Sequence, residues 1–216
     1  MTRQFLRRYT DLPSVLSILR SRAITLLSPD SWDDRNDRNL MAAYQRQKKY
    51  KTVLALCFSQ VPETYHHWKV FTAAKTGICV VFEKERLVSA LLGSGVKSSR
   101  VTYKTIHQLK ESPPTVDELP FTKRAAYTDE KEFRLLYTSK SKQLESKDAE
   151  VPIGAFEKIV VNPWLAEPLV AEVRRTIQLI PGFETLEVLQ RAFARPSCPP
   201  PLRLRWPAPA RFSAAR

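Results

Sequence analysis

The chain has few cysteines and few glycines, and each shortage excludes a class of site. Its three cysteines are an odd number and form no CxxC pair, so neither a disulfide framework nor a zinc site is indicated. Cys57 and Cys79 lie within apolar runs, which predicts buried thiols. Among the five glycines there is no GxGxxG after a strand and no GxxxxGK followed by Ser or Thr. The two common phosphate-binding loops are therefore excluded.

The chain also lacks a long apolar run. No stretch approaches the roughly 18–20 apolar residues that are needed to cross a bilayer. The N-terminal segment MTRQFLRRYT is polar and basic, unlike the apolar core of a signal peptide. We therefore expect a cytoplasmic protein with no membrane partner.

Acidic residues are in deficit, with 22 Asp and Glu against 35 Lys and Arg, and the formal net charge is +13. Residues 195–216 hold five arginines, six prolines and no acid, so +8 remains for residues 1–194. We expect residues 1–194 to form a single α+β domain and residues 195–216 a disordered basic tail. The charge suits a polyanionic partner, either nucleic acid or a phosphate-bearing ligand, although a role in solubility alone would explain it equally well.

Hydrophobic periodicity predicts strands alternating irregularly with helices. The expected strands are Phe5–Tyr9, Ala23–Leu27, Val53–Ser59, Gly77–Glu83, Arg100–Tyr103, Glu132–Ser139 and Phe156–Val161. The expected helices begin at Leu12 and cover Leu40–Tyr50, Glu63–Lys75, Lys84–Leu92, Thr115–Lys123, Ala166–Ile180 and Phe183–Phe193, while residues 30–37 and 139–150 are expected to be loops. This order predicts an α+β fold with a mixed, split or curved sheet and helices around a cleft.

Two carboxylates, Glu130 and Glu132, stand two residues apart at the start of a predicted strand. On an extended chain their side chains point to the same face. Two like charges on one face repel each other, so we expect them to have a functional or structural partner. One hypothesis is a pocket whose acidic group is Glu132. The alternative is a structural salt bridge between Glu132 and Arg134, its neighbour on the same face of the strand.

Several short stretches together resemble the bacterial domain-of-unknown-function family 2971. They are LRRY at 6–9, LLSP at 26–29 with WDD at 32–34, CFS at 57–59, Trp68 followed by GICVVF at 77–82, VTY at 101–103, EKEFR at 130–134 and KIVV at 158–161. The chain departs from the usual family pattern at Arg7, at Asp33-Asp34-Arg35, at Phe71 and at Phe133.

The same layout resembles the ADP-ribosyltransferase fold, whose motifs match Arg8, Ser59 and Glu130-x-Glu132. The resemblance implies NAD as a substrate and no metal. It gives Glu132 the role of stabilising the oxocarbenium-like state and Glu130 that of orienting or deprotonating the acceptor. Arg8 would hold a phosphate or ribose oxygen, and Ser59 would bind the ribose or support Glu132. Tyr9, Tyr65 or Trp68 would stack on the nicotinamide.

Each of these residues also has a structural interpretation. Arg8 could be a surface cation, Ser59 a strand end, and Tyr65 and Trp68 core aromatics. His66 and His67, adjacent on a helix, face different directions and do not suit a shared metal ion. Cys57 has apolar flanks, which favour an inert buried thiol over a nucleophile.

Two functions therefore stay open. One is an ADP-ribosyltransferase-like enzyme or NAD glycohydrolase that modifies a macromolecular acceptor, with a toxin or phage-defence role. The other is a non-catalytic basic module that binds nucleic acid or a protein partner.

Overall fold

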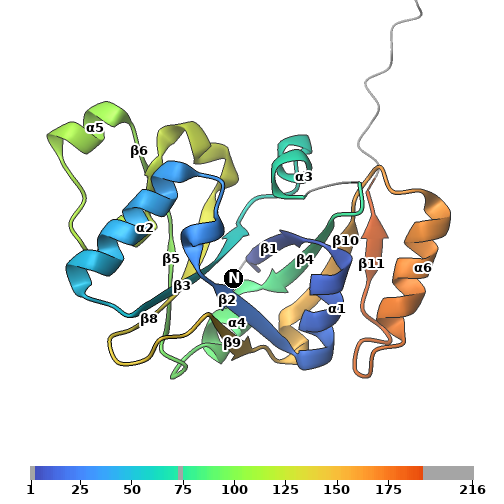
Figure 1. Ribbon diagram of the computed structural model, residues 1–216. Helices are drawn as coiled ribbons and strands as arrows, with labels where there is room; N and C mark the ends of the chain where they lie inside the picture. Colours follow the sequence, from blue (N-terminus) through green and yellow to red (C-terminus); the bar gives the residue numbers. More distant parts are fainter. Residues whose placement is uncertain (1–2, 73–74, 192–216) are drawn as a thin grey trace, which may run out of the picture.

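A nine-stranded mixed sheet runs through the computed structural model, which describes residues 3–72 and 75–191 (Figure 1). Its strand order is β11-β10-β4-β1-β3-β2-β9, with β8 added on β3 and β5 on β8. The strands are β1 (Phe5–Thr10), β2 (Ala23–Leu27), β3 (Thr52–Ser59), β4 (Ile78–Glu83), β5 (Val96–Arg100), β8 (Glu132–Ser139), β9 (Ser146–Glu150), β10 (Phe156–Val161) and β11 (Val188–Gln190). Of the strand pairs that the described residues form in this sheet, β10 with β11 is parallel and the others are antiparallel, and β6 (Thr102–Lys104) forms a separate parallel pair with β7 (Thr122–Arg124). The predicted α+β fold with a mixed sheet is confirmed.

The sheet is split beside β3. One edge of β3 pairs with β8 over all eight residues, from Thr52↔Ser139 to Ser59↔Glu132. The other edge is shared by two strands that each meet it at one register pair, β1 at Arg7↔Ser59 and β2 at Leu27↔Ala55. Between these two points no register pair joins β3 to β1 or β2 in the described residues, and the Arg8 side chain donates to the Cys57 carbonyl there.

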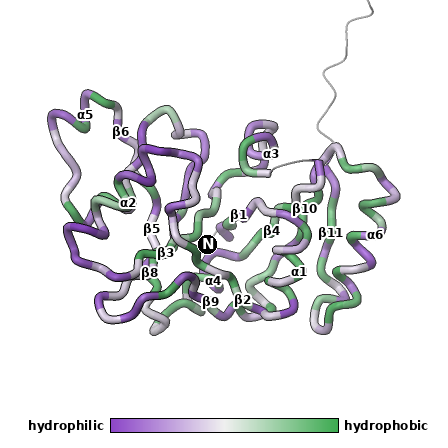
Figure 2. The backbone as a smooth tube through the Cα atoms, viewed as in Figure 1, coloured by the Kyte–Doolittle hydropathy of each residue, from purple (hydrophilic) through white to green (hydrophobic). Residues whose placement is uncertain are grey.

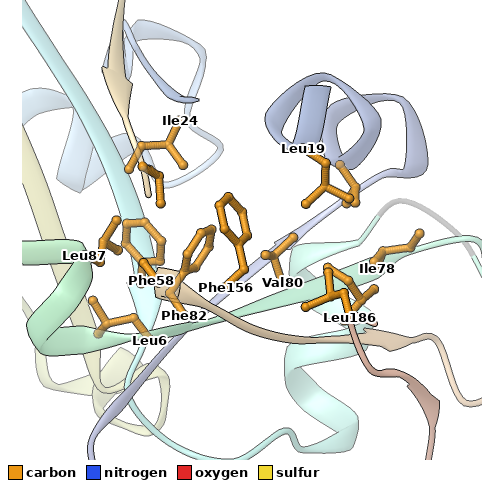
Figure 3. Packing of buried hydrophobic residues seen from close by; sticks show 14 of the residues in the cluster. Leu6, Leu19, Ile24, Phe58, Ile78, Val80, Phe82, Leu87, Phe156 and Leu186 are labelled. Carbon is orange, nitrogen blue, oxygen red and sulfur yellow. The ribbon is translucent and has the colours of Figure 1, made fainter. Parts of the chain in front are cut away.

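One face of the sheet carries the main apolar core (Figure 3). Three helices cover it: α1 (Leu12–Ser21), α4 (Lys84–Ala90) and α6 (Glu167–Gln178). Phe82 packs against Phe58 and Phe156, and Leu19, Leu87 and Val173 come from the helices. Asp11 caps α1 by accepting from the Ser14 N–H, and Pro13 lies in the first turn.

The opposite face carries two smaller apolar clusters, each under one helix. Helix α2 (Arg35–Lys48) covers Val53, Ala55 and Leu136 through Met41 and Tyr44. Helix α3 (Tyr65–Phe71) covers Tyr9, Cys79 and Val81 through Trp68. Figure 1 shows the two helices apart from each other above the sheet, and Figure 2 shows how hydrophilic α2 is compared with the strands beneath it.

The remaining elements are short. Helix α5 (Ile106–Glu111) and the 3-10 turns η1 (Pro29–Ser31), η2 (Leu119–Phe121), η3 (Ala125–Glu130) and η4 (Ile153–Ala155) complete the described chain. No helix in residues 3–72 and 75–191 is long and apolar enough to cross a membrane. The predicted tail 195–216 lies outside the described residues.

Several predicted elements were wrong. Residues 35–37 are the first turn of α2, because Asp34 caps the helix and acidic groups are favourable at a helix N-terminus. Residues 146–150 are β9, a polar edge strand on β2, and not a loop. The segment Phe183–Phe193 contains β11 instead of a helix, since α6 serves as the crossover between parallel strands β10 and β11.

Two further boundaries were wrong. The segment Arg100–Tyr103 is divided between β5 and β6, which pair with different partners. The predicted helix Thr115–Lys123 contains a 3-10 turn and the start of β7, and the helix of this region is α5.

Candidate functional site

A cavity of about 660 Å³ lies at the split beside β3, between α2 and α3. Strands β1, β2 and β3 contribute its floor, and the segments around Asp34, Phe71 and Lys123 contribute its walls. Arg8, Tyr9, Ser59, Glu130 and Glu132 all line it. The structure thus brings together five of the seven candidate residues named from the sequence, and leaves out Tyr65 and Trp68.

Strand register places Ser59 beside Glu132. Arg7, Ser59 and Glu132 are neighbours across β1, β3 and β8, so their side chains start from the same face of the sheet. The Ser59 hydroxyl accepts the N–H of Val61 at 3.4 Å, which leaves its own proton to donate.

Arg8 bridges the split. Its Nη1 donates to the Cys57 carbonyl oxygen at 3.3 Å, at the part of β3 that lies between the two register pairs. Burial lowers the pKa of this guanidinium, while the nearby Cys57 and Glu132 favour its charged form. Arg8 is therefore a half-buried cation facing the cavity.

Glu132 is held as a carboxylate by two buried cations. Only 4% of Glu132 is exposed; its Oε1 accepts from Arg134 Nε at 2.7 Å and its Oε2 from Lys123 Nζ at 3.3 Å. Burial alone would raise the pKa of Glu132, but the charges and hydrogen bonds of Arg134 and Lys123 outweigh it and lower the pKa to about 2. The Cys57 thiol adds to this effect. A negative charge thus stays on the cavity wall at neutral pH.

The pKa of Glu130 shifts in the opposite direction to that of Glu132. It ends η3, and the left-handed Lys131 (φ 43°) turns the chain before β8 begins. Its Oε2 accepts from Lys123 Nζ at 2.6 Å. Burial raises the pKa of Glu130 and the Lys123 charge only partly opposes this. Of the two acids, Glu130 is the one better suited to take up a proton.

Sequence reasoning missed Asp37 and Lys123. Asp37 lies on α2, is buried, and accepts a bidentate pair from Arg134, with Nη1···Oδ1 at 3.0 Å and Nη2···Oδ2 at 2.7 Å. Burial raises the pKa of Asp37, opposed by Arg134. Arg134 is 0% exposed, also donates to the Pro120 carbonyl at 2.7 Å, and lies over the Trp32 ring. An arginine inside the apolar run FRLLY requires buried carboxylates, and this signal could have indicated a partner beyond Glu132.

The predicted aromatic stacking residues separate into different environments. Tyr9 lines the cavity, although most of its ring is buried against Trp68 and Phe71. Trp68 is 2% exposed and packs edge-on against Tyr9, with 5.2 Å between ring centroids. It is not among the residues that line the cavity in the described part of the chain, and its place is in the core. Tyr65 is exposed and packs on Trp164.

His66 and His67 lie in different environments and make different contacts. His67 is buried and completes the α3 capping box with Thr64, while the exposed His66 lies 3.5 Å from Asp129. Within residues 3–72 and 75–191, no group of three or more His, Cys, Asp or Glu side chains is placed to hold a metal ion.

Cys57 is expected to be unreactive and dispensable for chemistry. Burial and the negative charge of Glu132 raise the pKa of its thiol well above the usual value, so little thiolate forms at neutral pH. In a Cys198→Ser background, maleimide should modify Cys57 and Cys79 slowly in the native protein and rapidly after unfolding. Fast native labelling of Cys57, followed by mass spectrometry, would contradict this assignment.

The depressed pKa of Glu132 predicts a specific pH dependence of stability. Its ordinary value of 4.5 applies to the unfolded chain and about 2 to the folded one. The ionised group therefore stabilises the fold fully above pH 5 and loses this contribution as the pH falls from about 5 to 2. The difference in unfolding free energy between the wild type and Glu132→Gln, measured by urea denaturation, should shrink across this window. A difference that is constant with pH would show that Glu132 is not charged in the fold.

Comparisons with known proteins give structural similarity only. No family model matches the chain, and no curated protein matches it. Solved structures of DarT from Thermus sp. 2.9 are similar to it, in complex with ADP-ribosylated ssDNA, with carba-NAD+ and with NAD+. Each is 15% identical with a TM-score of 0.41; each alignment covers 87% of this chain and 94%, 95% and 95% of those chains respectively. Similarity of this extent assigns neither activity nor ligand to this chain.

Proposed function

We propose that this chain is an ADP-ribosyltransferase-like enzyme that cleaves NAD and transfers ADP-ribose to a macromolecular acceptor. One observation carries the proposal: Glu132, ionised and buried, shares the wall of a single cavity with Arg8, Ser59 and Glu130. The cavity volume of about 660 Å³ falls within the roughly 300–1,000 Å³ that is usual for small-molecule sites.

The charges of the cavity suit NAD. Its pyrophosphate is an anion, and Arg8 offers a half-buried guanidinium with donors beyond the one that the Cys57 carbonyl takes. Its nicotinamide ribose becomes positively charged as the glycosidic bond weakens, and a fixed carboxylate stabilises that charge. A carboxylate has about four acceptor positions. Arg134 and Lys123 each take one on Glu132, so capacity remains for a ribose hydroxyl.

The bonding electrons and the proton of the proposed reaction can each be assigned to the reactants or to a residue of the cavity. The bond between ribose C1′ and the nicotinamide nitrogen breaks, and its electron pair leaves with the nicotinamide, which becomes neutral. A hydroxyl or amine of the acceptor, or water, forms the new bond to C1′. The proton of that nucleophile passes to Glu130, whose pKa is raised by burial. Ser59, next to Glu132 across the strands, would donate its free proton to the ribose.

The same ion network would also suit a chain without catalysis, since buried acids and bases can be purely structural. One measurement distinguishes NAD cleavage from non-catalytic binding. Purified protein incubated with NAD labelled in the nicotinamide ring should release labelled nicotinamide, with or without acceptor present. If no nicotinamide is released with any acceptor tested, the enzyme function is rejected and only the non-catalytic binding function remains.

A further inference from the structure

A second cavity of about 520 Å³ opens at the ends of β1, β3, β5 and β8. Its lining is strongly basic. Among residues 3–72 and 75–191, one acid, Glu132, and five cations line it; the cations are Arg3, Arg7, Lys84, Arg100 and Lys131. Like charges at this density repel one another unless an anion lies among them.

Glu132 and Arg7 line both cavities, so they form the wall between them. The main chain of Glu132 belongs to this wall as well, because its N–H donates to the Tyr103 hydroxyl at 2.8 Å and Tyr103 lines the second cavity. A molecule in the second cavity therefore adjoins the residue that we assign to the reacting ribose.

The basic groups of the second cavity are poorly compensated. Arg100 and Lys131 are exposed, and neither forms an ion pair with a carboxylate in the described part of the chain. Lys84 lies over the Phe133 ring and donates to Gln4; burial lowers its pKa and Arg100 lowers it further. Arg3 pairs with Glu157 at the rim.

Aromatic rings accompany these cations. Phe5 and Tyr103 line the same cavity and are half-buried, so each presents part of a ring. A basic groove with interleaved aromatic side chains is the usual way to bind single-stranded nucleic acid, through phosphate contacts and base stacking. An acidic protein segment would use the cations but would have no need of the rings.

We propose that the second cavity is an acceptor subsite for single-stranded nucleic acid, whose phosphates contact Arg100, Lys131 and Lys84. Only the transfer step of this inference rests on the proposed function. In that step a base or ribose nucleophile of the strand attacks C1′ of the nicotinamide ribose across the Glu132 wall, and the nicotinamide leaves with the bonding electron pair. The binding itself does not require NAD.

The test is binding of a fluorescent 12-nucleotide single strand, as DNA and as RNA, to the full chain without NAD at several salt concentrations. Arg100→Gln with Lys131→Gln should weaken binding about tenfold or more. It should also reduce the slope of log K against log salt by about 1.4, since each lost phosphate contact contributes about 0.7 on a single strand. The matched control is Arg46→Gln with Lys142→Gln, which removes the same charges from exposed positions outside both cavities. Nicotinamide release without oligonucleotide is measured in parallel on every variant.

The outcomes separate the two proposals. A loss confined to the Arg100 and Lys131 variant supports the subsite, whichever of DNA and RNA binds better, and it does so even if no variant releases nicotinamide. Equal loss in the control overturns it, because the binding would then follow total charge. Absence of binding to either strand at low salt also overturns it. If nicotinamide release and labelling of a protein acceptor occur without such binding, the proposed function survives and the nucleic-acid subsite does not.

Discussion

Replacing Glu132 with Gln is expected to reduce nicotinamide release by about 10²–10³-fold, the usual cost of removing one preorganised charge-stabilising group. The amide keeps the shape of the side chain but loses the negative charge that faces the developing cation. Arg134 and Lys123 would keep Asp37 and Glu130 as partners, so the local network would become neutral instead of carrying its net negative charge. The initial rate of release of labelled nicotinamide measures the effect.

The control for this variant is Glu172→Gln, the same change at an exposed ion pair on α6. It should release nicotinamide at the wild-type rate. Because Glu132 is buried, thermal unfolding must show that Glu132→Gln is folded at the assay temperature. A folded variant with an unchanged rate would remove Glu132 from the chemistry and leave it a purely structural group.

Replacing Arg134 with Met is expected to destabilise the fold by about 3–5 kcal/mol. The guanidinium is 0% exposed and satisfies Asp37 with two hydrogen bonds and Glu132 with one. Its removal would leave Lys123 as the remaining cation beside three buried carboxylates: Asp37, Glu130 and Glu132. Urea denaturation at pH 7 gives the change in unfolding free energy.

A double variant identifies the cause of that loss. Arg134→Met combined with Asp37→Leu removes one uncompensated charge together with its partner, and it should recover a large part of the stability. Arg175→Met, at an exposed pair with Glu172, should change the unfolding free energy by less than about 1 kcal/mol. If Arg134→Met were as mild as this control, the buried network would not be a major contributor to stability.

The strands were predictable because their apolar runs are local signals. Ala23–Leu27, Glu132–Ser139 and Phe156–Val161 were predicted with the observed bounds. The elements that failed depend on distant partners: β9 is polar and exists because β2 offers an edge, and β11 has three residues beside β10. No local pattern marks such strands.

Only part of the site was predictable from the sequence. Arg8, Ser59, Glu130 and Glu132 were expected together and line one cavity. The roles given to them remain predictions. Asp37 and Lys123 could not be placed, because the contact of each with the network crosses between elements: Asp37 meets Arg134 across 97 positions of sequence. Arg134 was correctly expected as a partner of Glu132, and the structure shows that this salt bridge and a place on the cavity wall coexist.

The split beside β3 has a mechanical consequence. β1 is bound to β4 by six register pairs and β8 to β3 by eight, whereas β1 meets β3 at one. The sheet therefore consists of two groups of strands that share few register pairs, with apolar side chains of the main core, such as Leu6 on β1 and Phe58 on β3, on both sides of the junction. Apolar contacts are non-directional and tolerate small sliding better than ladder hydrogen bonds do. The first cavity lies at this junction, so we expect its width to adjust to a ligand more readily than the pairing within either group of strands.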